Sequence, residues 1–124
     1  MSAKLPVGQG IWPAFWMLGA NIGSAGWPVC GELDIMEWVG HDPLRIHGTL
    51  HGPGYRGGGG LGAWHQSEAG VAADYHRYAV EWKPGVVRWY FDGQLYEERT
   101  MLDLAGRRGR YPCLRATASR TSAR

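Results

Sequence analysis

Hydrophobic and polar residues alternate along several short stretches of the chain, which is the pattern of half-buried β-strands. The clearest stretch runs from Leu44 to His51. One of its faces is polar, with Arg45, His47, Thr49 and His51, and the other carries Leu44, Ile46, Gly48 and Leu50. We therefore predict a strand here with one face in the core and one face turned outward.

A second strand is predicted from Ile11 to Leu18, where both alternating sets of positions are apolar or aromatic. Pro13 lacks a backbone N–H and should break the hydrogen-bond ladder near the start of this strand. The following residues, 19–28, are rich in Gly, Asn and Ser and are predicted to form a loop.

Three further strands are predicted between Tyr75 and Arg99 as a meander. The turns are indicated by Pro84-Gly85 and by Asp92-Gly93, and the second of these is a strong hairpin signal. Two apolar stripes precede and follow the first turn, formed by Tyr78, Val80 and Trp82 and by Val87, Trp89 and Phe91.

The remaining segments show no strand pattern. Residues 52–62 contain four consecutive glycines and are predicted to be a mobile surface loop without regular structure. No helix of ten or more residues is expected. After Asp103 the alternation ends, so we divide the chain into a partial domain, 1–103, and an irregular Arg-rich tail, 104–124.

Composition supports a folded β protein and excludes some functions. Of 124 residues, 44% are hydrophobic, with 7 Trp and 6 Tyr, and the net charge is only +2. The basic residues of the tail lack interleaved aromatics, so we expect no nucleic-acid partner. The sequence contains neither an apolar stretch long enough to cross a membrane nor a signal peptide. Cys30 and Cys113 are expected to be free thiols.

The segment from Gly31 to Glu37, Gly-Glu-Leu-Asp-Ile-Met-Glu, places three carboxylates within six residues of a strand-like apolar run. Strict alternation would put Glu32 and Asp34 on one face and Glu37 on the other. A β-bulge at Met36 would add one residue and return Glu37 to the face of the other two acids. Three like charges so close together cannot all stay ionised without an energetic cost, which indicates a functional role for these acids.

Three carboxylates on one face suit retaining glycoside hydrolysis, in which one carboxylate attacks the anomeric carbon and a protonated one donates to the leaving oxygen. Glu32 and Glu37 are the natural pair, and Asp34 between them would orient the attacking residue. A site for Ca²⁺ or Mg²⁺ and a strand with solvated charges are the alternatives. Because the acids alternate with Leu and Ile, we predict no metal and no cofactor.

Aromatic side chains could supply the rest of a sugar site, because the apolar face of a pyranose packs on Trp. Trp12 and Trp16 are four residues apart and would face the same way on one strand, although core positions are the simpler interpretation. His47 and His51 share the polar face of their strand. Either could contact a carboxylate or a sugar hydroxyl, or be a structural histidine.

The motifs together resemble glycoside hydrolase family 16, with the bacterial laminarinase branch most similar. The resemblance rests on residues 10–19, on the Glu-x-Asp-x-x-Glu motif, and on three later segments: Gly48-Thr49-Leu50-His51, Tyr75 to Trp82, and Trp89 to Gly93. It implies that Glu32 is the nucleophile, Asp34 its assistant and Glu37 the acid/base. Trp12 and Trp16 would line the sugar cleft, and we assign His51 to substrate binding as well.

The resemblance also implies an all-β fold, an antiparallel β-sandwich of the jelly-roll type with the cleft on its concave face. The substrate would be β-1,3-glucan or mixed-linkage glucan, and the protein would be secreted; we expect a monomer. Family members are roughly twice this length, so we expect an incomplete sandwich, a fragment whose Arg-rich tail could come from a shifted reading frame. The competing functions are a non-catalytic carbohydrate-binding domain and an inactive truncated sandwich.

Overall fold

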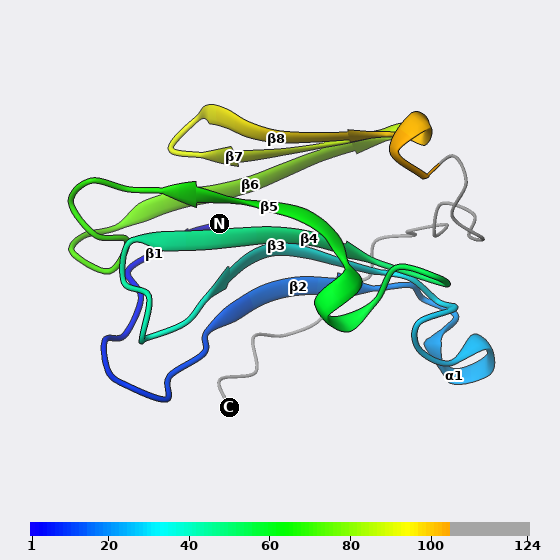
Figure 1. Ribbon diagram of the computed structural model, residues 1–124, viewed down its shortest axis with the longest axis horizontal. Helices are drawn as coiled ribbons and strands as arrows, with labels where there is room; N and C mark the ends of the chain where they lie inside the picture. Colours follow the sequence, from blue (N-terminus) through cyan, green and yellow to red (C-terminus); the bar gives the residue numbers. More distant parts are fainter. Residues whose placement is uncertain (105–124) are drawn as a thin grey trace.

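A computed structural model describes residues 1–104 and consists of two antiparallel four-stranded sheets stacked on each other (Figure 1). The first sheet has the order β2-β3-β4-β5 and the second the order β1-β6-β7-β8. The first sheet contains Ala14–Leu18 (β2), Glu32–Trp38 (β3), Arg45–His51 (β4) and Leu61–Gln66 (β5), and the second contains Ser2–Ala3 (β1), His76–Lys83 (β6), Val86–Phe91 (β7) and Gln94–Thr100 (β8). The predicted β-sandwich is therefore confirmed.

The helices are short: Ile22–Ala25 (α1), Gly57–Gly59 (η1) and Met101–Leu104 (η2). The first lies inside the predicted loop 19–28. None of the described helices has the length and apolar character needed to cross a bilayer. The predicted tail lies outside the described residues except for Leu104, and Cys113 lies outside them as well.

The meander is confirmed, since β6, β7 and β8 pair in sequence, and so is the strand at 44–51, where buried and half-buried residues alternate along β4. The strand predicted from Ile11 begins only at Ala14. Its first three residues were predicted wrongly, because Pro13 cannot donate to the ladder and the regular pairing starts immediately after it.

The prediction of an irregular loop over residues 52–62 is wrong in two respects. The last two of these residues belong to β5, and Tyr55 within the segment is only 1% exposed. A Cβ on Gly62 would lie 2.1 Å from the carbonyl oxygen of Gly48 on the neighbouring strand. The glycine at 62 thus allows two strands to approach closely. From the sequence alone, a glycine needed for close approach cannot be distinguished from one that makes a loop flexible.

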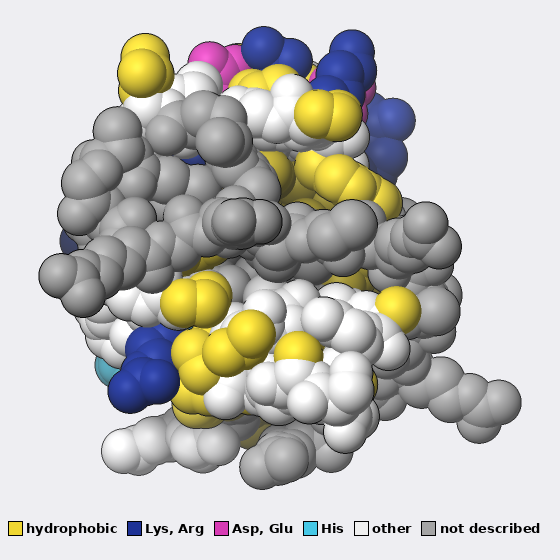
Figure 2. Space-filling view, turned by 90° about the vertical axis from the view of Figure 1, so that its right-hand side faces the viewer, with side chains coloured by type: hydrophobic (Ala, Val, Ile, Leu, Met, Phe, Trp, Pro, Cys, Tyr) yellow, Lys and Arg dark blue, Asp and Glu magenta, His cyan; other side chains and the backbone are white. Residues whose placement is uncertain are grey.

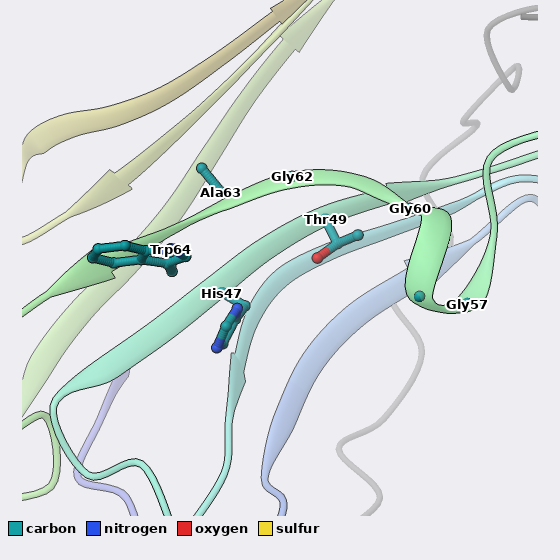
Figure 3. Close-up of a pocket in the computed structure, with 8 residues that line it drawn as sticks. His47, Thr49, Gly57, Gly60, Gly62, Ala63 and Trp64 are labelled. Carbon is teal, nitrogen blue, oxygen red and sulfur yellow. The ribbon is translucent and has the colours of Figure 1, made fainter.

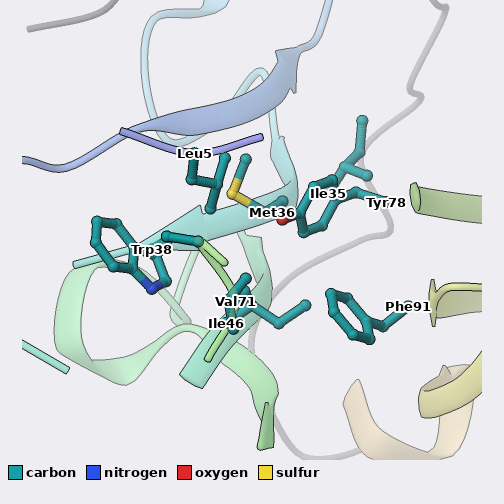
Figure 4. Close-up of a cluster of buried hydrophobic side chains, with 9 residues drawn as sticks. Leu5, Ile35, Met36, Trp38, Ile46, Val71, Tyr78 and Phe91 are labelled. Carbon is teal, nitrogen blue, oxygen red and sulfur yellow. The ribbon is translucent and has the colours of Figure 1, made fainter. Parts of the chain in front are cut away.

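The core lies between the sheets and forms two clusters, the first of which is shown in Figure 4. In the first, Ile35, Met36 and Trp38 of β3 pack with Tyr78 and Phe91 of the second sheet. In the second, Leu33 packs with Leu50, Tyr55, Leu61, Val87 and Trp89. Cys30 is 2% exposed, as expected for a small buried hydrophobe. The inward residues of β3 therefore fix the position of the acids between them.

The second sheet turns a charged face outward. Arg88 of β7 pairs with Glu98 of β8 at 2.5 Å, and Tyr90 donates to Glu81 at 2.9 Å. Figure 2 shows Lys and Arg side chains beside acidic ones along the top of the molecule, where this sheet lies in Figure 1. The same view shows hydrophobic side chains exposed lower down, near the end that carries α1.

Candidate active site

A β-bulge in β3 brings the three acids to one face. Glu32 pairs with His51 and Glu37 pairs with His47 on β4, so five steps along β3 match four steps along β4. The shift falls between Asp34 and Glu37, at the predicted place. Ile35 and Met36 are both buried, 4% and 1% exposed, as expected when two consecutive bulge residues point to the core. Glu37 thereby returns to the outer face of Glu32 and Asp34.

The second sheet supports the bulge from beneath. Trp89 of β7 donates its indole N–H to the backbone oxygen of Asp34 at 2.8 Å, and this bond is buried. Space for the indole comes from Gly48, which lies opposite the bulge, because a Cβ there would be 2.4 Å from Trp89 Cδ1. A carbonyl next to the extra residue is thus satisfied by a side chain from the other sheet.

Asp34 is the most buried of the three acids, at 2% exposed. Its pKa is raised to about 7, chiefly by burial and also by the charges of Glu37 and Glu32, while the contact with His51 opposes the shift. Nε2 of His51 lies 3.2 Å from Oδ2 of Asp34, and this contact raises the pKa of His51 in turn. The protonation of the two side chains is therefore coupled.

The other two acids are half-buried and lie at either end of the motif. Glu32 accepts a short hydrogen bond from the indole N–H of Trp27. The pKa of Glu37 is raised, chiefly by burial, although nearby His51 and His47 and the indole of Trp12 oppose the shift. A carboxyl group with a raised pKa can hold a proton for donation, as a general acid must.

Comparisons with known proteins identify the family. The sequence model for Glycosyl hydrolases family 16 matches residues 1–122. The chain belongs to this family. It is 45% identical over 97 residues to the Beta-glucanase of Rhodothermus marinus, covering 76% of this chain and 34% of that protein. It is 38% identical over 104 residues to the Glucan endo-1,3-beta-glucosidase of Cryptopygus antarcticus, covering 82% of this chain and 38% of that protein.

A solved structure agrees with the sequence comparisons. The laminarinase catalytic domain of Thermotoga maritima superposes with a TM-score of 0.80 at 51% identity, over 85% of this chain and 43% of that one. The chain thus spans between a third and a half of the length of these family 16 relatives. The resemblance seen in the sequence is confirmed at the level of family and fold.

The residues that the sequence assigned to substrate binding lie around the acids, but in different settings. Trp16 pairs with Asp34 across β2 and β3 and is half-buried. Trp12 precedes β2, is 59% exposed and reaches Glu37, so the two tryptophans do not share one strand as expected. The side chain of His51 is only 12% exposed and is directed at Asp34. Their contacts with sugar remain predictions.

Two exposed tryptophans near the acids were not among the residues that the sequence predicted to bind sugar. Trp27, 47% exposed, lies in the loop before β3, and Trp64, 52% exposed, pairs with His47 across β4 and β5. A hollow of about 190 Å³ is lined by His47, Thr49 and Trp64 and by glycines of the turn at 57–60. Figure 3 shows these residues. The alternation of Gly62 and Trp64 could have indicated that Trp64 lies on a strand, but the neighbouring glycines made the segment resemble a loop.

Proposed function

We propose that this chain carries the catalytic acids of a retaining endo-β-glucanase that hydrolyses β-1,3-glucan or mixed-linkage glucan. The observation that supports this most strongly is the bulge, which presents Glu32, Asp34 and Glu37 on one surface. Exposed tryptophans on the same sheet and in the adjoining loop supply apolar platforms for pyranose rings. The names of the relatives, a β-glucanase, an endo-1,3-β-glucosidase and a laminarinase, suggest the glucan class.

In the proposed reaction Glu32 attacks the anomeric carbon while Glu37 transfers its proton to the leaving glycosidic oxygen. The chain then carries a glycosyl ester on Glu32. Glu37, now ionised, removes a proton from water, and the water oxygen displaces Glu32 from the anomeric carbon. The hydrogen bond from Trp27 holds the Glu32 carboxylate, and burial of Glu37 favours its protonated form before the first step.

Asp34 would assist without touching the sugar. Because its pKa is close to 7, it carries less than a full charge near neutral pH and repels the carboxylate of Glu32 less than an ordinary Asp would. In its protonated form it can donate a hydrogen bond toward the nucleophile. A protein acting on such polymers would be secreted, and we expect it to act as a monomer without a cofactor.

Release of reducing ends from laminarin tests the proposal. We expect the chain, or the longer protein containing it, to release them, and Glu32→Gln to abolish release while the circular dichroism spectrum is unchanged. Asp34→Asn should be impaired less completely. Binding of laminarin without release would favour a non-catalytic carbohydrate-binding domain. Wild-type rates in Glu32→Gln would contradict the assigned nucleophile.

A further inference from the structure

The structure places His51 beside the acidic motif, which is one of the roles that the sequence left open for this histidine. Glu32, Asp34 and His51 each bring one potential ligand atom to a cluster in which all three atoms lie within 4.8 Å of one another. Two carboxylates and an imidazole form a mixed oxygen and nitrogen set. This set is typical of borderline transition metals such as Zn²⁺, whereas Ca²⁺ and Mg²⁺ prefer shells made entirely of oxygen.

The distances suit a tetrahedral ion. Ligands at about 2.0–2.1 Å from Zn²⁺ are separated from one another by about 3.3 Å when the geometry is tetrahedral. Nε2 of His51 and Oδ2 of Asp34 are 3.2 Å apart. Glu32 is half-buried, so its side chain can turn, and one of its oxygens can keep the hydrogen bond from Trp27 while the other faces the ion.

A second observation points to a ligand at this place. Asp34 is 2% exposed, and among the described residues the nearest donor to its Oδ2 atom, Nε2 of His51 at 3.2 Å, does not have the geometry of a hydrogen bond. A buried carboxylate oxygen without a well-aligned donor is costly, and a cation between Asp34 and His51 would satisfy it. A divalent ion would also neutralise the two negative charges that Glu32 and Asp34 place side by side.

We propose that Glu32, Asp34 and His51 form a binding site for a divalent transition metal, and that the bound ion blocks glucan hydrolysis by engaging the nucleophile. The ligand set predicts tighter binding of Cu²⁺ than of Zn²⁺ and weaker binding of Mn²⁺. Metal must displace the protons of His51 Nε2 and Asp34, so binding strengthens as the pH rises. The inhibition of hydrolysis by the bound metal rests on the proposed function, whereas the metal-binding site itself does not.

Isothermal titration of the metal-free chain with ZnCl₂, without glycan, tests the site. All proteins carry Cys113→Ser, because thiolates also bind Zn²⁺. We expect one Zn²⁺ per chain. His51→Asn should weaken its affinity at least ~10-fold, since even loss of an outer-shell partner typically costs ~10–100-fold. The matched control is His47→Asn, on the same face of β4 but opposite Glu37, and it should change the affinity less than about twofold.

Three results would overturn the site: no Zn²⁺ binding, equal weakening by both histidine variants, or equally tight binding of Ca²⁺. If His51→Asn does not fold, Glu32→Gln replaces it, since Glu32 is half-buried and the change keeps its shape. The absorption spectrum of bound Co²⁺ reports tetrahedral coordination independently.

Hydrolysis of laminarin with increasing Zn²⁺ separates the two proposals. Inhibition with the midpoint found by titration supports the inference. Active enzyme that neither binds nor responds to Zn²⁺ contradicts it and leaves the proposed function intact. A chain that binds Zn²⁺ through His51 but never releases reducing ends supports the metal site and contradicts the proposed function.

Discussion

Nε2 of His51 on β4 lies 3.2 Å from Oδ2 of Asp34 on β3, and both side chains are almost completely buried. In an open solvent-exposed pair this contact would contribute little to stability. Here it joins the central acid of the motif to a histidine on the neighbouring strand. The pair therefore links the protonation of the site to the packing of two strands.

The raised pKa of Asp34 makes stability depend on pH. Its folded pKa is about 7, against 3.8 ordinarily, so its contribution is full below about pH 4 and is lost as the pH rises through 7. Asp34→Asn removes this titration. Relative to wild type, the free energy of unfolding of the variant should rise between pH 4 and 8 by up to about 4 kcal/mol, measured by urea unfolding.

Asp92→Asn is the matched control for this experiment. Burial alone would raise the pKa of Asp92, but the hydrogen bonds from the Arg77 N–H and from His76 lower it. Its stabilising contribution is therefore present above the ordinary pKa and is lost only in acid. A pH-dependence of Asp34→Asn that resembles that of Asp92→Asn would contradict the assignment.

Removing the proposed acid should affect substrates according to their leaving groups. Glu37→Ala is expected to lower kcat/KM on laminarin by about 10²-fold or more, the usual contribution of a general acid. An aryl β-glucoside with a good leaving group needs no proton and should lose far less. Glu68→Ala, an exposed carboxylate after β5, should leave both rates unchanged. Equal losses on both substrates would show that Glu37 has another role.

Trp89→Phe should disturb the acids from the opposite side of the core. The substitution keeps most of the apolar volume but leaves the buried carbonyl of Asp34 without its donor, at a cost of about 1–3 kcal/mol. We expect a lower free energy of unfolding and a lower kcat. Trp38→Phe is the control, because the indole N–H of Trp38 donates only a long hydrogen bond, 3.5 Å, to the carbonyl oxygen of Pro43. A similar fall in kcat in both variants would argue against support of the bulge.

Gly48→Ala tests the same support without removing a hydrogen-bonding group. The new Cβ would lie 2.4 Å from Cδ1 and 2.7 Å from Nε1 of Trp89, so the indole must shift. Overpacking of this kind costs about 1–3 kcal/mol, to be measured by thermal or urea unfolding. Gly58→Ala should be close to neutral, because nothing lies within 4 Å of its Cβ position. Unchanged stability in Gly48→Ala would mean that Trp89 has room to move.

Trp64 is expected to bind glucan. Trp64→Ala should weaken binding of a laminarin oligosaccharide about fivefold or more, because one aromatic contact contributes about 1 kcal/mol beyond its buried area. Trp82→Ala is the control, an exposed tryptophan on the second sheet. Titration calorimetry on both variants measures the difference. Equal affinities would place the sugar away from the hollow between β4 and β5.

Much of the molecule followed from local patterns. The meander, the alternation along β4 and the position of the bulge were readable because period-two patterning and turn residues act within a few positions of one another. The bulge could be placed because strict alternation leaves Glu37 on the opposite face from Glu32 and Asp34, and one extra residue between them returns it to their face. Strand β5 was not predicted in full because its glycine, Gly62, serves a close contact with another strand, and no local rule reports such a contact.

The sequence alone determined the spacing of Glu32, Asp34 and Glu37 and the face they share, because these depend on steps along one strand. The two-sheet class followed from the resemblance to a known family. Only the tertiary structure decided that His51 would meet Asp34 and that Trp89 would support the bulge. The reason is physical: burial and contacts between strands distant in sequence depend on how the sheets pair and stack. These contacts set the pKa values and the ligand geometry of the site.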